Sequence, residues 1–288
     1  MPSLAIKRWS KIKAYAKAIK FANVLKPQTF DINVHISDDI MTFMNNIDTL
    51  EWNVFDLQEL TGGRALYYTA LYLINRHNLI NKLNLNSTKL MEFLNAIEKG
   101  YKPNPYHNST HGCDVMQTVH HMLLKGTGFQ YLSDIDLLAA IIASACHDYA
   151  HPGVSNLFER LTESERAVRF NDQSILENFH CSETFMLLYL PQYNFMDNVP
   201  KEDKRQFRDL VISMILATDI GRHFALLDHL RKGIAKAFDG RDRENVVDML
   251  RMIIKCADVG NPAKPRDISE KWSHMVQEEF FAQGDMEK

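Results

Sequence analysis

The sequence is poor in cysteine, with four in 288 residues and no Cys-x-x-Cys pair. Four scattered cysteines cannot build a disulfide framework, which favours a reducing compartment and predicts a cytoplasmic protein. We expect all four to be small buried residues: Cys113, Cys146, Cys181 and Cys256.

Long hydrophobic runs and an excess of one charge are also missing. The longest apolar run, residues 137–146, is about half of the ~20 residues that a membrane helix needs, so we expect no transmembrane span. The first thirty residues lack the apolar core of a signal peptide, so we expect no secretory signal. Lysine and arginine number 33 against 36 aspartates and glutamates, so nucleic acid is not an expected partner.

One segment departs from this charge balance. Residues 3–26 contain seven basic residues and no acidic one. Their apolar side chains recur at helical spacing: Trp9, Ile12, Ala16 and Ile19. Such a basic amphipathic helix can lie on an anionic membrane, be bound by calmodulin, or pack on its own domain, and all three options stay open. We expect residues 1–48 to form this helix and a linker.

Beyond residue 37 the chain lacks the alternating polar and apolar residues of strands. Helical patterns separated by short polar or Gly/Pro segments predict an all-α fold, with residues 49–288 as one domain. The predicted helices cover residues 38–50, 65–75, 87–98, 109–125, 172–190, 201–218, 222–238, 243–257 and 265–283. Capping-box spacing marks two further helix starts, at Ser133 with Asp136 and at Thr162 with Glu165.

The most informative stretch is residues 136–155. Its first half is small and apolar without a break, which predicts a helix buried on most sides. The helix should deliver His147, Asp148 and His151 to its C-terminal end, where a Pro-Gly pair stops it. Imidazole and carboxylate converging at a helix end suit a metal ion, and a solvent-exposed polar helix end is the alternative.

Two other predicted helices carry ligand-type residues at their ends. His107 and His111 lie four apart at a helix start, on one face and one turn from each other. This spacing suits a pair of metal ligands, although surface and core histidines share it. Asp258 closes a third helix just before a Gly-Asn-Pro segment. Because buried charges are paired or coordinate metals, the three helices together predict a metal site.

Five segments follow in a specific order between about residue 52 and the C-terminus. They read Asn-Pro-Tyr-His-Asn-Ser-Thr-His, His-Asp-Tyr-Ala-His-Pro-Gly-Val-Ser-Asn, Asn-Asp-Gln-Ser-Ile-Leu-Glu-Asn, Leu-Ala-Thr-Asp and Cys-Ala-Asp-Val-Gly-Asn-Pro. This order resembles the class I cyclic nucleotide phosphodiesterases, HD-type metal-dependent phosphohydrolases, with flanks most like the calmodulin-regulated and cAMP-specific subfamilies. The resemblance implies hydrolysis of 3′,5′-cyclic nucleotides, cAMP and/or cGMP, to nucleoside 5′-monophosphates.

The resemblance also implies a metal centre. His111, His147, Asp148 and Asp258 would hold a first ion, normally Zn²⁺, and Asp148 would bridge to a second, Mg²⁺ or Mn²⁺. Imidazole mixed with carboxylate suits zinc, whereas one carboxylate with several waters suits magnesium. A hydroxide held by both metals would attack the cyclic phosphate, and His107 would protonate the leaving oxygen.

Further roles follow from the same resemblance. His151 would contact the phosphate, and Glu177, Thr218 and Asp219 would order the water around the metals. The base-pocket positions of the family fall on Tyr106, Ile220, Val259, Asn261, Val276 and Phe280. Taken alone, each residue has a structural reading, because a helical glutamate is usually solvated, a threonine can bond back to its own helix and apolar residues are ordinary core.

The chain departs from the family pattern near its end. Family domains continue past a segment like residues 278–285 into helices that carry a purine-binding glutamine and a stacking phenylalanine, whereas this sequence stops at Lys288. We therefore expect the domain to lack these C-terminal helices and to leave uncovered the part of the core that they would cover. Two other functions stay open: a catalytically weak regulatory or scaffold module, and an HD-type hydrolase of other phosphoesters such as nucleoside triphosphates or guanosine alarmones.

Overall fold

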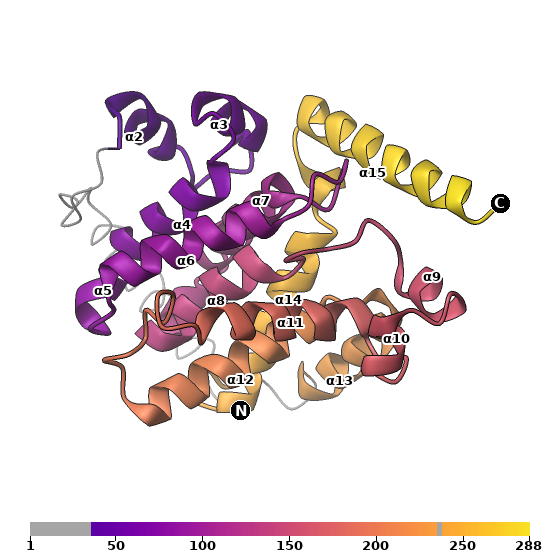
Figure 1. The fold of residues 1–288 in the computed structure, drawn as a ribbon. Coiled ribbons are helices and arrows are strands. Elements are labelled where there is room, and N and C mark those ends of the chain that lie inside the picture. Colours follow the sequence, from indigo (N-terminus) through magenta and orange to yellow (C-terminus); the bar gives the residue numbers. More distant parts are fainter. Residues whose placement is uncertain (1–35, 235–237) are drawn as a thin grey trace, which may run out of the picture.

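The computed structural model describes residues 36–234 and 238–288, and the regular elements of these residues are all helices (Figure 1). The all-α prediction is therefore confirmed for the described chain. The basic helix predicted in residues 3–26 lies outside the described residues.

Most of the helices are joined by short loops. The N-terminal ones are α2 (Asp38–Met44), α3 (Val54–Leu60), α4 (Ala65–Arg76), α5 (Leu79–Lys82) and α6 (Ser87–Gly100). The central ones are α7 (Ser109–Lys125), η1 (Gly128–Tyr131), α8 (Asp134–Cys146), α9 (Asn156–Leu161), α10 (Glu165–Arg169) and α11 (Ile175–Leu188). The C-terminal ones are α12 (Lys201–Ala217), η2 (Ile220–Arg222), α13 (His223–Ile234), α14 (Arg243–Asp258), η3 (Asn261–Ala263) and α15 (Arg266–Met286).

Helix α8 lies in the middle of the core. Every side chain from Ile135 to Cys146 is buried, and α7, α12 and α4 pack around the helix. Small side chains along it let these neighbours approach closely. The core also reaches N-terminal of residue 49, because Ile40, Met44 and Ile47 are buried in the same cluster.

One of the two predicted capping boxes is present. Ser133 accepts a hydrogen bond from the Asp136 main chain, and the Asp136 carboxylate accepts one from the Ser133 main chain, so α8 begins as predicted. The capping box predicted at Thr162 and Glu165 is absent, so that prediction was wrong. Thr162 ends α9 and its hydroxyl donates to the carbonyl of Phe158 at 2.8 Å, while Ser164 caps α10 instead.

Helix α8 ends earlier than predicted. It stops at Cys146, before the Pro-Gly pair, and His147 is its C-cap residue. The Ser144 carbonyl, which a continuing helix would use, accepts from the His147 ring at 2.9 Å. Ala150 then adopts a left-handed φ of 61°, so His151 leaves the helix axis rather than following His147 by one regular turn.

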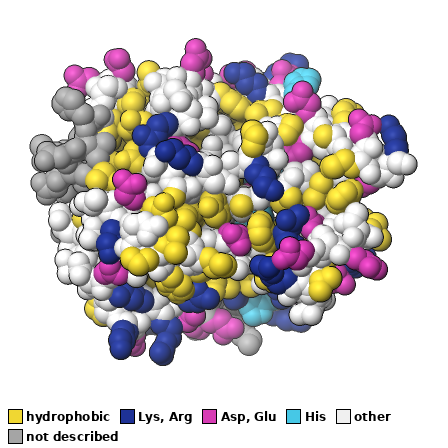
Figure 2. Space-filling model, in the orientation of Figure 1, with side chains coloured by type: hydrophobic (Ala, Val, Ile, Leu, Met, Phe, Trp, Pro, Cys, Tyr) yellow, Lys and Arg dark blue, Asp and Glu magenta, His cyan; other side chains and the backbone are white. Residues whose placement is uncertain are grey.

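The surface carries charge of both signs. On the face shown in Figure 2, basic and acidic side chains are interspersed with apolar ones. Within the described chain, no single helix is both long and apolar enough to cross a membrane, and one helix pair of suitable length and composition, in α12 and α13, is bent by 85°.

Candidate active site

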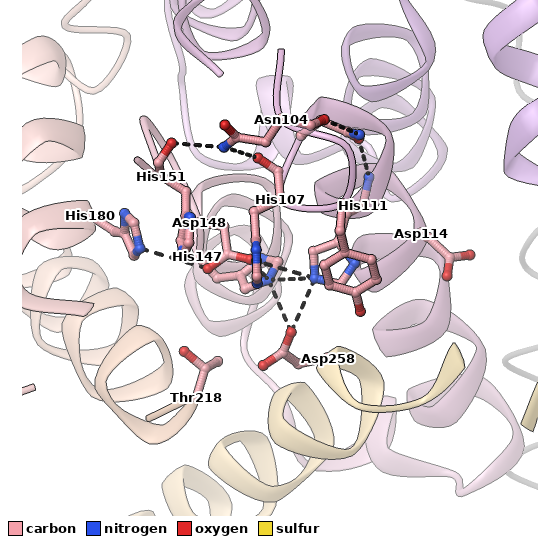
Figure 3. A network of polar contacts seen from close by, with 12 residues as sticks. Asn104, His107, His111, Asp114, His147, Asp148, His151, His180, Thr218 and Asp258 are labelled. Carbon is pink, nitrogen blue, oxygen red and sulfur yellow. Dashed lines mark hydrogen bonds and ion pairs between the residues drawn. The ribbon is translucent and has the colours of Figure 1, made fainter. Parts of the chain in front are cut away.

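Helices α7, α8 and α14 bring four ligand-type side chains together (Figure 3). His111 Nε2 lies 3.3 Å from His147 Nε2 and 3.1 Å from Asp258 Oδ1. Asp148 Oδ2 lies 3.1 Å from His147 Nε2 and 3.5 Å from His111 Nε2. Bonds of about 2.0–2.1 Å from zinc to nitrogen or oxygen would give a tetrahedron with edges of about 3.3–3.4 Å. The cluster can therefore hold a single small cation.

The two imidazoles of this cluster are prepared to act as ligands. Both are fully buried, and His147 Nδ1 donates to the Ser144 carbonyl, which leaves Nε2 as the free lone pair of the neutral ring. Burial opposes protonation of His147, but Asp148 and Asp258 outweigh it and raise its pKa well above the usual range. A cation bound between these carboxylates would replace that proton.

A capping asparagine fixes the start of α7. The Asn108 side chain accepts from the main-chain N–H groups of Thr110 and His111 at 2.9 and 3.2 Å, and its own amide donates to the Asn104 carbonyl. His107 precedes this cap, so the prediction that it shares a helix face with His111 was wrong. The two rings are nevertheless only 6.0 Å apart, because the capped loop folds back over the helix start.

His107 is held from the far end of the sequence by Glu279 of α15. The Glu279 carboxylate contacts His107 Nδ1 and accepts from the main-chain N–H groups of Tyr106 and His107 at 2.9 and 3.0 Å. Burial lowers the pKa of His107, but Glu279 and Asp148 more than offset it, so the pKa is raised. Glu279 therefore favours the protonated form of the imidazole beside the cluster.

A second histidine stacks on the first. The rings of His151 and His107 are 3.9 Å apart and 14° from parallel. Burial, with the neighbouring charge of His107, keeps the pKa of His151 well below its usual range. His151 Nδ1 accepts from the Gly153 main chain at 3.0 Å, so the neutral ring carries its proton on Nε2. His180 stacks on the other side of His151, and its Nε2 lies 3.7 Å from Asp148 Oδ1.

Sequence reasoning missed Glu279 and His180. One signal for Glu279 was available, since it continues the buried positions Ile268 and Trp272 along α15, and a carboxylate on an apolar stripe needs a partner. His180 is one of several inward-facing residues of α11 and had no comparable signal.

The three residues predicted to order water, Glu177, Thr218 and Asp219, have hydrogen-bond partners of their own. Asn156 donates to both oxygens of Glu177 at 3.0 and 3.1 Å, and Ser174 donates to Asp219 at 2.6 Å. Burial and the charge of Asp219 raise the pKa of Glu177 to about 7. The Thr218 hydroxyl donates to the Ile215 carbonyl of its own helix at 2.8 Å.

Two residues of the predicted base pocket are in contact. The Tyr106 hydroxyl bonds to Asn261 Oδ1, and the Asn261 amide donates to Asp114 at 3.1 Å. Asp114 in turn pairs with Lys264 at 2.9 Å, with both side chains buried. This series of hydrogen bonds fixes the orientation of the Asn261 amide, because the Asp114 carboxylate can only accept a hydrogen bond.

The remaining base-pocket candidates are not ordinary core residues. Ile220, Val259 and Phe280 expose 67%, 55% and 63% of their surface, and Val276 is half-buried. Four apolar side chains are thus available to a ligand, but the described chain does not enclose them.

A family model described as 3′,5′-cyclic nucleotide phosphodiesterase matches residues 106–288, which include the whole cluster and His107. The chain belongs to this phosphodiesterase family. The family predicted from the ordered motifs is therefore confirmed, and phosphodiesterases of known sequence and structure resemble the chain over most of its length.

Two curated phosphodiesterases illustrate the likeness. The dual specificity calcium/calmodulin-dependent 3′,5′-cyclic nucleotide phosphodiesterase 1 of Drosophila melanogaster is 36% identical over 252 residues, which are 87% of this chain and 30% of that protein. The human enzyme named 1B is 38% identical over 253 residues, which are 87% of this chain and 46% of that protein. The chain thus spans less than half the length of these relatives.

A solved structure shares the fold. The phosphodiesterase domain of the RhoPDE fusion protein from the choanoflagellate Salpingoeca rosetta superposes with a TM-score of 0.78 at 27% identity. The match covers 87% of this chain and 78% of that domain.

Proposed function

We propose that this chain hydrolyses 3′,5′-cyclic nucleotides to nucleoside 5′-monophosphates, with residues 49–288 as its catalytic domain and α2 packed on the same core. Family membership supports the reaction class. The observation that carries the proposal is the buried cluster of two imidazoles and two carboxylates, with a further imidazole, His107, held beside it by Glu279.

The donor set supports an assignment of the metals. Two imidazole nitrogens and two carboxylate oxygens are usual ligands of Zn²⁺, which His111, His147, Asp148 and Asp258 would hold. Asp148 Oδ2 faces this cluster, whereas Asp148 Oδ1 faces His180. Oδ1 is therefore the oxygen available to Mg²⁺ or Mn²⁺. When bound, such ions lower the pKa of water toward about 7 and neutralise charge on phosphoryl oxygens.

His107 is the proposed general acid. Departure of the 3′ oxygen as an alkoxide is unfavourable unless a proton reaches it. Because Glu279 engages Nδ1 of His107, the proton to be transferred lies on Nε2, and Glu279 stabilises the charged ring before transfer. Glu279 is a positioning residue in this scheme, since it touches His107 and not the substrate.

The neighbouring residues have complementary roles. His151 is neutral with its proton on Nε2, which suits a hydrogen bond to a phosphoryl oxygen. Glu177 and Asp219, with Thr218 at their side, would order water near the cluster. We assign the nucleobase to the apolar surface around the Tyr106 and Asn261 pair.

The base-binding surface would consist of residues from η2, η3 and α15, from the loop before α7 and from the residue after α14, and a flat purine would contact their apolar faces. Its members are Tyr106, Ile220, Val259, Asn261, Val276 and Phe280.

A direct hydrolysis assay tests the reaction. Chain loaded with zinc and magnesium is given cAMP and cGMP side by side, with EDTA-treated chain as the control and 5′-monophosphate as the product measured. Metal-dependent release is the expected result. A panel of nucleoside triphosphates and guanosine alarmones, assayed in parallel, would instead identify a hydrolase of other phosphoesters. Absence of turnover with both metals bound would contradict the proposal and favour a binding module.

Calmodulin is a proposed partner. The relatives described above are named calcium/calmodulin-dependent, and residues 3–26 have the basic amphipathic pattern that calmodulin binds. An anionic membrane would attract the same segment, and a cytoplasmic location suits either partner.

A further inference from the structure

A buried lysine lies beside the metal cluster and has no role in the scheme above. Lys255 is on α14, about one turn before Asp258, and is 2% exposed. Its ammonium donates to three main-chain carbonyls, those of Ala217, Thr218 and Asp219, at 3.1, 3.3 and 3.0 Å. An ammonium has three donors, so these three contacts satisfy it completely.

Two of these carbonyls, those of Ala217 and Thr218, lie at the C-terminal end of α12, whereas the third, of Asp219, begins η2 and also accepts from the Arg222 main chain at 3.2 Å. The last carbonyls of a helix have no partner within the helix and carry its negative partial charge, so a cation there is stabilising. Within the described residues Lys255 forms no ion pair at contact distance. Burial lowers its pKa, while the more distant carboxylates of Asp258, Asp219 and Glu177 oppose that shift.

The turn that Lys255 holds carries Asp219, one of the residues proposed above to order water at the metals. Asp219 accepts from the Ser174 hydroxyl at 2.6 Å and from the Gly221 main chain at 2.7 Å. Figure 3 shows the end of α12, at Thr218, facing the end of α14, at Asp258. Lys255 thus links the helix that supplies a cluster carboxylate to the turn that carries Asp219, in addition to the bond that Arg251 of α14 donates to Ser213 of α12 at 2.6 Å.

We propose that Lys255 is a positioning residue that fixes the turn at residues 217–219 against α14 and so sets Asp219 relative to the metal cluster. The inference rests on the proposed function, because it gives Lys255 a task at the same site. It requires that loss of the lysine weakens binding of the second, water-rich ion.

Charge alone would have the opposite effect. If Lys255 acted only as a nearby positive charge, its removal would take away repulsion and strengthen cation binding. If it positions the turn, its removal lets the turn move and weakens binding, typically by roughly 10- to 100-fold for residues that orient a metal site. The direction of the change therefore separates the two explanations.

The experiment compares Lys255→Met and Lys255→Arg with the wild-type chain, all loaded with zinc. Mn²⁺ binding is titrated by electron paramagnetic resonance, and zinc content, melting temperature, kcat and KM are measured on the same samples. We expect Lys255→Met to keep its zinc, to bind Mn²⁺ roughly 10- to 100-fold more weakly and to lose kcat. Lys255→Arg, which keeps the charge and supplies five donors, should restore part of both.

Ile74→Val is the matched control for stability. It removes one methyl group from a fully buried side chain of α4 and should leave Mn²⁺ binding unchanged at temperatures below its melting point. If Lys255→Met does not fold, Lys255→Gln, which keeps two donors without the charge, takes its place.

The proposal would be overturned if Lys255→Met or Lys255→Gln bound Mn²⁺ at least as tightly as the wild type. It would also be overturned if the wild-type chain bound no Mn²⁺. Failure of the wild type to hydrolyse any cyclic nucleotide would instead count against the proposed function. The Mn²⁺ comparison would still decide the role of Lys255 in that case.

Discussion

Replacing Glu279 with glutamine should separate proton donation from metal binding. The carboxylate serves three donors, the main-chain N–H groups of Tyr106 and His107 and the Nδ1–H of the His107 ring. A glutamine offers one acceptor oxygen and a donating amide, so one side of this arrangement loses its partner. If the oxygen stays on the main-chain donors, the amide faces Nδ1 and the charged ring is no longer stabilised.

The magnitude follows from the bond that is lost. A hydrogen bond to a charged group is worth about 1.5–3 kcal/mol, which corresponds to roughly 10- to 100-fold in kcat/KM. Loss of Glu279 removes an interaction that raises the pKa of His107, so the pKa falls. A general acid works only while protonated, and activity should therefore decline at a lower pH in the variant than in the wild type as pH increases.

The assay is kcat/KM for cAMP as a function of pH, with zinc content measured on the same samples. Both proteins carry the same metals, so the effect of the metals on His107 is common to both. Glu278→Gln is the matched control, because Glu278 is the adjacent, exposed carboxylate of the same helix. An unchanged pH profile in Glu279→Gln, or an equal loss of activity in Glu278→Gln, would contradict the role assigned to Glu279.

Four further predictions concern other parts of the chain. Asp258→Ala removes one of four ligands and should lower bound zinc, measured by mass spectrometry; unchanged zinc would contradict the site. His107→Asn should keep the metals and slow turnover by roughly 10²- to 10⁴-fold, and full activity would exclude its role as the acid. Deletion of residues 1–26 should abolish binding to calcium-loaded calmodulin or to anionic vesicles, and absence of both in the intact chain would leave that segment without either role. Burial opposes ionisation of Asp48, but His120 and Arg76 outweigh it and lower its pKa, so Asp48→Asn should cost roughly 1–3 kcal/mol of stability at neutral pH. In chemical denaturation this difference should shrink as pH falls below about 4, the ordinary aspartate pKa, and a constant difference would contradict the pairing.

The features that sequence could predict are those that a single helix displays. The pattern of residues 109–125 gave α7 its bounds, and the apolar run before His147 predicted the buried helix α8. The four cluster residues could be nominated because each sits at a helix end. Short helices such as α5 and α9 were not predicted, because fewer than two turns show no periodicity.

Contacts between segments far apart in the chain could not be predicted from the sequence. Glu279 meets a histidine 172 residues away, and Lys255 meets carbonyls 36 to 38 residues away. Both partners depend on how helices pack, which their own periodicity does not encode. The prediction of helix caps from sequence is limited as well. Ser164, two residues after Thr162, is an equally good capping residue, and it is the one that caps α10.

The attachment of His107 to α15 has a practical consequence for anyone purifying this protein. The cluster is assembled by α7, α8 and α14, whereas His107, the proposed proton donor, is held in place by a carboxylate from a different helix. A sample in which α15 has come loose would still contain its full complement of metal and would still pass an elemental analysis. Metal stoichiometry will therefore overstate the fraction of competent molecules, and titration with a tight-binding substrate analogue is the measure to use when rate constants are normalised.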